Sequence, residues 1–211
     1  TDMELLQSGK HPGKINVTDA DNGLNILRYF TDKPTVVILK HNNPCGVAQA
    51  DSIGEAYVNA DLADRVAAFG GCICANRPID KVTAEEISQR YAEVVVAPEY
   101  EQGAMEILAS RKNLRIVRIG NIAKLQEIAA SRFIDFKSLV DGGIIAQLSF
   151  VTPVVKKEDL LPAECEYKGT MYKVDRQPTE KEYADMMFGW LVETGVTSNS
   201  VLYVKDLCTV G

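Results

Sequence analysis

A lysine and a histidine stand side by side in the motif Lys40-His41-Asn42-Asn43-Pro44-Cys45-Gly46. The chain contains only two histidines, so this pairing of an imidazole with an ammonium group is unusual within it. An imidazole can take up and return a proton, and a neighbouring ammonium group can stabilise a developing negative charge. The pair can therefore supply a proton acceptor beside a fixed positive charge.

The residues before the pair predict a buried β-strand that carries it to the rim of a sheet. Residues 35–39 are apolar and rich in β-branched side chains, and the run ends abruptly at Lys40. Pro44 and Gly46 are expected to fix the path of the loop that follows. Consecutive strand residues point to opposite faces, so both side chains can serve one pocket only if the backbone leaves strand geometry at this point. The alternative interpretation is a strand end that simply meets solvent.

Three further positions have residue types that suit ligand binding. Phe69-Gly70-Gly71 combines an aromatic ring with residues that let a ligand approach the backbone, although it can equally be a plain turn. Glu93 stands directly before an apolar run. It can be a solvated residue at the start of a strand, or an acceptor for a ligand amine or hydroxyl group. Asn199 lies between two serines, and it can be either a turn residue or a ligand contact.

Composition excludes several classes of protein. The 211 residues carry a net charge of −6 with a pI near 5.1, which argues against nucleic-acid binding. No run of about 18 apolar residues predicts a membrane span, and the N-terminus has no secretory signal pattern. Five scattered cysteines fit reduced thiols in the cytoplasm. The pair Cys72 and Cys74 lacks the partners of a zinc site, so no metal is expected.

Residues 1–120 alternate between strand and helix patterns, which predicts an α/β fold with a buried sheet. A turn is expected at Asp21-Asn22-Gly23, before a short helix. The helices are predicted at 24–30, 52–63, 83–91 and 102–111, and the strands at 35–39, 72–75, 94–97 and 114–119.

Residues 121–211 follow a different pattern. Residues 122–134 are predicted to be helical or mixed, and 151–178 to be a polar surface connection. Gly142-Gly143 loosely repeats Gly70-Gly71, a hint of internal duplication. A long helix is expected from 179 to 192, with Tyr183, Met186, Met187, Trp190 and Leu191 in the core, and a final strand at 200–204.

The Lys40–Gly46 string closely resembles the signature of AICAR transformylase, the formyltransferase part of the bifunctional purine-biosynthesis enzymes that also carry IMP cyclohydrolase. Other stretches resemble family landmarks in the same order, so the resemblance covers nearly the whole chain. They are Leu5–Lys10, Asp19-Ala20-Asp21, Phe69-Gly70-Gly71, Asn76–Asp80, Ala97-Pro98 and Ser198–Val201.

The resemblance implies formyl transfer from 10-formyltetrahydrofolate, a co-substrate, to the 5-amino group of AICAR, giving FAICAR. By position, His41 is the expected general base and Lys40 its electrostatic partner. The expected substrate-binding residues are Asn43, Phe69, Gly70, Glu93 and Asn199. The implied fold is a pair of cytidine-deaminase-like three-layer α/β/α lobes, one complete at 1–120 and one partial at 121–211, in a homodimer.

The resemblance also has departures. The family's Arg-Tyr-Gly-Glu-Asn-Pro-His-Gln string, whose arginine and tyrosine help to hold the substrate phosphate, does not occur here, and neither does the cyclohydrolase region. The chain is therefore expected to be an internal piece of the enzyme. The alternative is a truncated, non-catalytic homologue that binds nucleotide or only dimerises.

Overall fold

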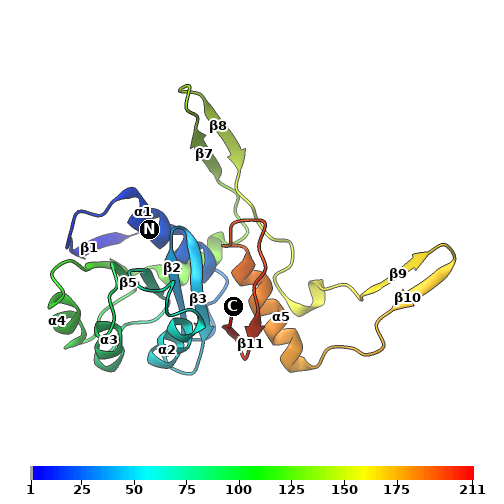
Figure 1. Cartoon of the computed structure of the whole chain (residues 1–211), viewed down its shortest axis with the longest axis horizontal. Helices are drawn as coiled ribbons and strands as arrows, with labels where there is room; N and C mark the ends of the chain where they lie inside the picture. Colours follow the sequence, from blue (N-terminus) through cyan, green and yellow to red (C-terminus); the bar gives the residue numbers. More distant parts are fainter. Residues whose placement is uncertain (1) are drawn as a thin grey trace.

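An eight-stranded mixed sheet forms the centre of the molecule (Figure 1), seen here in a computed structural model that describes residues 2–211. The strand order is β1-β6-β5-β4-β2-β3-β12-β11. Strands β4, β5 and β6 are parallel, whereas β2 runs antiparallel to both β4 and β3. The strands of this sheet are β1 (Met3–Gln7), β2 (Thr35–Lys40), β3 (Asn43–Gln49), β4 (Cys72–Ala75), β5 (Val94–Ala97), β6 (Arg115–Ile119), β11 (Val204–Lys205) and β12 (Cys208–Thr209).

Helices cover both faces of the sheet, which confirms the predicted α/β class. Helices α2 (Ile53–Ala63), α3 (Lys81–Ser88) and α4 (Ala104–Ala109) contribute to one hydrophobic cluster. Helices α1 (Lys14–Leu27) and α5 (Glu180–Glu193) and the 3-10 helix η1 (Ile122–Ile128) contribute to the other. The closer likeness to cytidine deaminase remains a prediction.

Strand β2 shows why the sequence signal for the central strands is strong. Its apolar side chains alternate between the two clusters, with Val36 and Ile38 in one and Val37 and Leu39 in the other. A strand buried on both faces needs a continuous apolar run. The predicted strands at 35–39, 72–75, 94–97 and 114–119 are accordingly confirmed to within one residue.

Helix α1 differs from the prediction, because the expected turn at Asp21-Asn22-Gly23 lies inside it. A Cβ atom at Gly23 would overlap the side chain of Cys74 and touch Leu39. The glycine therefore allows the helix to lie close against the sheet, and tertiary packing overrides its poor helix propensity.

Helix α3 and the final strand also differ from the prediction. Helix α3 begins at Lys81 because the Asp80 side chain accepts a hydrogen bond from the Thr83 amide at 2.7 Å, so Asp80 caps the helix. The final strand, predicted at 200–204, is replaced by the short strands β11 and β12.

Helix α5 is confirmed, and Leu191 is buried as predicted, but the rest of the predicted core face is only partly covered. Phe188, Leu191 and Val192 are buried, whereas Met186 and Trp190 are each 46% exposed. Strand β12, which follows α5, pairs with β3 and extends the central sheet. The eight-stranded sheet thus contains strands from both sides of residue 120, and the division into lobes there remains a prediction.

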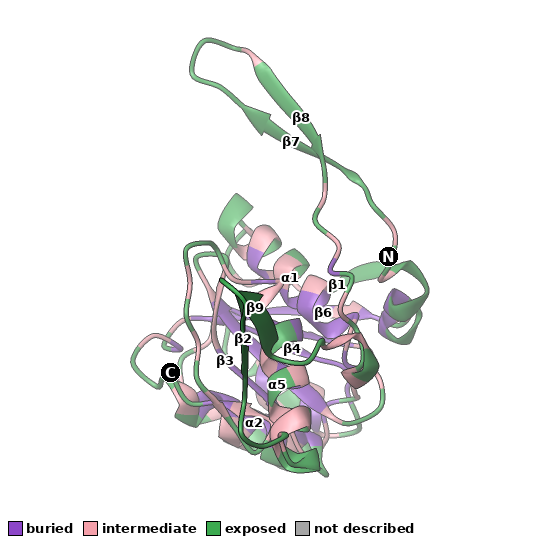
Figure 2. Cartoon of the chain, turned by 90° about the vertical axis from the view of Figure 1, so that its right-hand side faces the viewer, coloured by how far each residue is buried: buried purple, intermediate pink, exposed green. Residues whose placement is uncertain are grey.

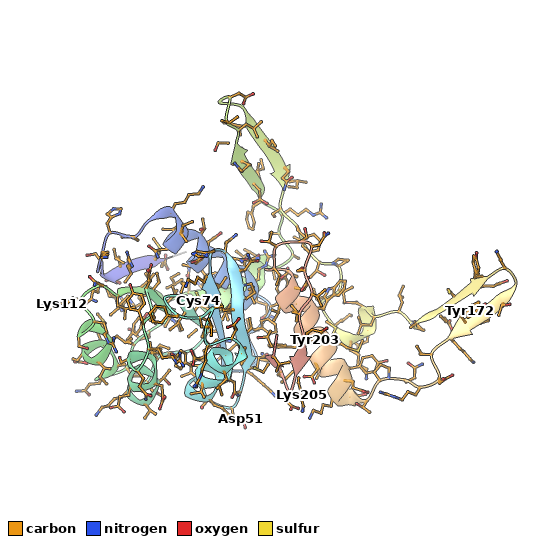
Figure 3. All side chains as sticks on the ribbon, in the orientation of Figure 1. Asp51, Cys74, Lys112, Tyr172, Tyr203 and Lys205 are labelled. Atoms are coloured by element: carbon orange, nitrogen blue, oxygen red, sulfur yellow. The ribbon has the colours of Figure 1, made fainter. Side chains whose placement is uncertain are left out.

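Two β-hairpins project from the body (Figure 1). One consists of β7 (Ile134–Ser138) and β8 (Ile144–Leu148), and the other of β9 (Glu164–Tyr167) and β10 (Thr170–Lys173), while the 3-10 turn η2 (Lys157–Asp159) lies between them. Figure 2 shows the β7–β8 hairpin in the colour of exposed residues. Figure 3 shows Tyr172 far out on the second hairpin and Cys74 within the body. The glycine pair 142–143 lies at the exposed tip of the first hairpin, whereas 70–71 precedes buried β4, so the suggested duplication is wrong.

Candidate active site

The Lys40-His41 pair lies at a two-residue hairpin turn between β2 and β3. Lys40 pairs with Asn43, and the two residues between them have left-handed backbones, with φ of 56° at His41 and 63° at Asn42. This is the turn that matches the twist of paired strands. The backbone leaves strand geometry directly after Lys40, which is the condition for both side chains to serve one pocket. Residues 43–49, expected as a loop, form strand β3 instead.

A cavity of about 480 Å³ lies beside the turn, and both Lys40 and His41 line it. The rest of its wall comes from β3, from the end of α2 and the residues after it, and from Gly211. Its volume is within the range of small-molecule sites. His41 is exposed, so its imidazole is accessible from solvent.

The Phe69-Gly70 loop contacts the Lys40 side chain directly. The Lys40 ammonium group donates a hydrogen bond of 2.7 Å to the Phe69 carbonyl. The Phe69 ring is 58% exposed and packs on Tyr91, with ring centroids 5.3 Å apart. Gly70 has a φ of 75°, and its amide donates to the Tyr91 carbonyl at 2.8 Å. The structure thus brings this loop and the lysine together.

Glu93 lies at the same edge of the sheet but outside the cavity. It precedes β5, which is separated from β2 by β4. Its carboxylate lies 3.5 Å from the Arg115 guanidinium and accepts a hydrogen bond of 3.1 Å from the Asn16 side-chain amide. Strands lie about 4.8 Å apart, so two strand spacings separate Glu93 from Lys40 by roughly 10 Å.

Asn199 lies in the segment between α5 and β11, and its side chain is exposed. The segment runs beside the hairpin turn, because the Asn43 side-chain oxygen accepts a hydrogen bond of 2.9 Å from the Thr197 amide. The structure therefore brings a residue two positions from Asn199 into contact with Asn43.

Cys45 is the only thiol among the residues that line the cavity, and it is a poor nucleophile. Burial, followed by the negative charge of Asp64, raises the pKa of Cys45 to about 11. The thiol is therefore protonated at neutral pH. Within residues 2–211, no three histidine, cysteine or carboxylate side chains gather as a metal-binding group would require.

The sequence did not single out the side chains that support the site. Asp19 accepts a hydrogen bond of 2.5 Å from the Asn42 amide, and the Asn22 side chain donates to the Asn42 carbonyl at 3.0 Å. Arg115 is buried, and its guanidinium forms an ion pair with Glu93 and donates a hydrogen bond of 2.8 Å to the carbonyl of Lys10. Asp19 did appear in a family landmark, but only the tertiary contact gives it a role.

The arrangement can perform proton transfer beside a fixed positive charge. The imidazole of His41 can accept a proton from a group in the cavity. An ammonium group has three N–H donors, so the bond to Phe69 leaves Lys40 with two more for an anionic oxygen. Among residues 2–211, no helix has the length and apolar character needed to cross a bilayer.

Comparison with known proteins gives a consistent result along the whole chain. The sequence profile described as AICARFT/IMPCHase bienzyme matches residues 1–211. A protein of Caldicellulosiruptor bescii, named bifunctional purine biosynthesis protein PurH, is 36% identical over 203 residues. A protein of the same name from Bacillus cereus (strain B4264) is 40% identical over 203 residues.

These alignments cover 96% of this chain but 36% of each relative. The chain therefore spans about a third of the length of the curated relatives it matches.

Proposed function

Because the chain belongs to the AICARFT/IMPCHase bienzyme family, we propose that it carries the Lys-His centre for formyl transfer in purine biosynthesis. The reaction moves the formyl group of 10-formyltetrahydrofolate to the 5-amino group of AICAR and yields FAICAR. The observation that carries this proposal is the placement of Lys40 and His41 on one cavity by a left-handed turn.

His41 acts as the general base in this proposal. The 5-amino group of AICAR is conjugated to an imidazole ring that bears a carboxamide, so it is a weak nucleophile. As its nitrogen forms a bond to the formyl carbon, the His41 imidazole removes the amine proton. The C–N bond to the folate then breaks, and His41 returns the proton to the departing folate nitrogen. Such proton transfer contributes about 10²–10⁴-fold to a rate.

Lys40 stabilises the tetrahedral intermediate, whose oxygen carries negative charge. Its hydrogen bond to the Phe69 carbonyl holds the ammonium group in place while two donors remain free. The loss of one such donor typically costs about 3 kcal/mol, or roughly two decades in rate.

The remaining candidates contact the substrates. The exposed Phe69 ring and the backbone at Gly70 suit a flat ligand ring lying next to Lys40. The Glu93 carboxylate is assigned to the ribose side of AICAR, and Asn43 and Asn199 to polar contacts near the reacting amine. The open cavity and this exposed ring are the features that fit the folate co-substrate.

We also propose a cytoplasmic homodimer. All five cysteines, which lie within the described residues, are free thiols, as in a reducing compartment. The β7–β8 hairpin presents apolar side chains to solvent, which suits contact with a second copy.

Replacement of His41 by Ala tests the function. The substitution removes the base at an exposed turn, so we expect formyl transfer to fall at least about 10²-fold while the thermal midpoint stays unchanged. Turnover is measured spectroscopically in the longest natural polypeptide that contains this chain. His11→Ala is the matched control, because it removes the other histidine from a position outside the cavity.

Retained turnover in His41→Ala contradicts the proposal. Calorimetry with AICAR and a folate analogue distinguishes the formyltransferase from the alternative, a non-catalytic homologue. Binding of ligand by the wild-type protein without any turnover favours a non-catalytic nucleotide-binding homologue.

A further inference from the structure

Side chains of helix α1 form hydrogen bonds with both the amide and the carbonyl group of Asn42. Asp19 is only 4% exposed, and its carboxylate accepts a hydrogen bond of 2.5 Å from the Asn42 amide. The Asn22 side chain donates a bond of 3.0 Å to the Asn42 carbonyl. Residues three apart lie on one face of a helix, so a single turn of α1 provides both contacts.

The same polar groups link the turn to the segment that carries Asn199. The Asn22 side-chain amide also donates to the Gly195 carbonyl at 2.8 Å. Asn43 accepts a hydrogen bond from the Thr197 amide at 2.9 Å. One direct contact, between Asn43 and Thr197, and one bridge through Asn22 therefore connect the hairpin with residues 195–197, which are about 150 positions away along the chain.

The conformation of the turn explains why such support is needed. His41 and Asn42 both have positive φ, which is unfavourable for residues with a Cβ atom and persists only when the surroundings enforce it. A carboxylate that accepts from a backbone amide forms a charge-assisted bond, stronger than one between neutral groups. Asp19 is thus placed to hold the backbone that sets the direction of the His41 side chain.

We propose that Asp19 and Asn22 are positioning residues for His41, and that Asn22 and Asn43 keep the turn in register with the segment carrying Asn199. This inference rests on the proposed function, since it gives His41 the part of the base. Asp19 and Asn22 act through the backbone of Asn42 and take no part in the proton transfer.

The test compares Asp19→Ala, Asp19→Asn and Asn22→Ala in the longest natural polypeptide that contains this chain. We expect kcat to fall about 10- to 100-fold in both Ala variants, because a misplaced base is inefficient. In Asp19→Ala, KM for AICAR and for the folate should stay within about twofold, since the substrate contacts remain. In Asn22→Ala, which also frees the segment carrying Asn199, KM for AICAR should rise together with the fall in kcat. Asp19→Asn keeps an acceptor oxygen and should restore most of the rate.

Asn76→Ala is the matched control. Asn76 is also a buried polar side chain that holds backbone groups, but it acts at the opposite end of β2, where it binds the amide of Thr35. It should lower stability without changing kcat. Hydrogen exchange adds a readout independent of activity, because the Asn42 amide should exchange about tenfold faster or more in Asp19→Ala and remain unchanged in Asn76→Ala.

The outcomes show whether the positioning role of Asp19 and Asn22 fails alone or together with the proposed function. Full kcat in folded Asp19→Ala, together with lost turnover in His41→Ala, overturns the positioning role alone. A fall in kcat that is equal in Asn76→Ala, or a rise in KM alone, also overturns it. Full turnover in His41→Ala overturns the proposed function and this inference with it.

Discussion

At the scale of single residues, Gly46 shows how tertiary contact changes the meaning of a sequence signal. The glycine was expected to set the path of a loop, but it lies buried in β3. A Cβ atom there would overlap the backbone carbonyl of Ala60 in α2. Gly46 therefore allows helix α2 to lie directly on the strand that follows the Lys40-His41 turn. The atoms that a side chain would meet belong to the α2 backbone, which cannot move aside easily.

We predict that Gly46→Ala lowers the free energy of unfolding by about 3 kcal/mol, because the added methyl group overpacks the α2–β3 contact. Urea unfolding followed by circular dichroism measures the change. Gly120→Ala is the control, since nothing lies within 4 Å of a Cβ atom at that exposed position. Equal stability of the two variants would refute the packing argument.

At the scale of elements, the start of α5 is held by a local network of charges and caps. Thr179 and Glu182 form the capping box that the sequence predicts. The Glu182 carboxylate also accepts two hydrogen bonds from the Arg176 guanidinium, at 2.8 and 2.7 Å. These bonds, with those from Thr179, lower the pKa of Glu182 to about 2.

This shift predicts the pH range in which the cap acts. The folded-state pKa lies below the ordinary value of 4.5, so the stabilising effect is complete above about pH 4.5 and is lost as the pH falls towards 2. NMR titration of the Glu182 carboxyl group should give a midpoint near pH 2. In Arg176→Gln the midpoint should move up towards 4.5, and an unmoved midpoint would show that Arg176 is not the main cause.

At the scale of the whole molecule, the β7–β8 hairpin is amphipathic but uncovered. Cross-strand partners share a face, and the register pairs Ile134 with Leu148 and Phe136 with Ala146. This face is apolar, and the Phe136 ring is 71% exposed. The opposite face carries polar residues such as Lys137. A two-stranded hairpin is barely stable alone in water, and we propose that a second copy of the protein covers its apolar face.

For the proposed dimer, we predict that Phe136→Asp lowers the measured mass to that of a monomer, because it puts a charge into the proposed contact. Light scattering coupled to size-exclusion chromatography measures the mass. Lys137→Gln, on the polar face of the same strand, should have the same mass in solution as the wild-type protein. A dimer that persists in Phe136→Asp would place the contact elsewhere.

The sequence alone determined the central strands and the α/β class, because a strand buried on both faces requires an uninterrupted apolar run. It also singled out Lys40 and His41, because their chemistry follows from residue type. It misplaced the start of α1, because Gly23 is accommodated by contact with β4 and not by local propensity. It likewise misassigned Met186 and Trp190, because which helix face is buried depends on what packs against it.

Only the tertiary structure decided how the candidate site is assembled. Asp19, Asn22 and the segment at 195–197 converge on one turn from positions up to 173 residues apart, and no sequence pattern marks such contacts. Local interactions leave a trace along the chain because their partners are a few residues away. Polar contacts between distant elements leave none, since each partner is fixed by the packing of the whole sheet.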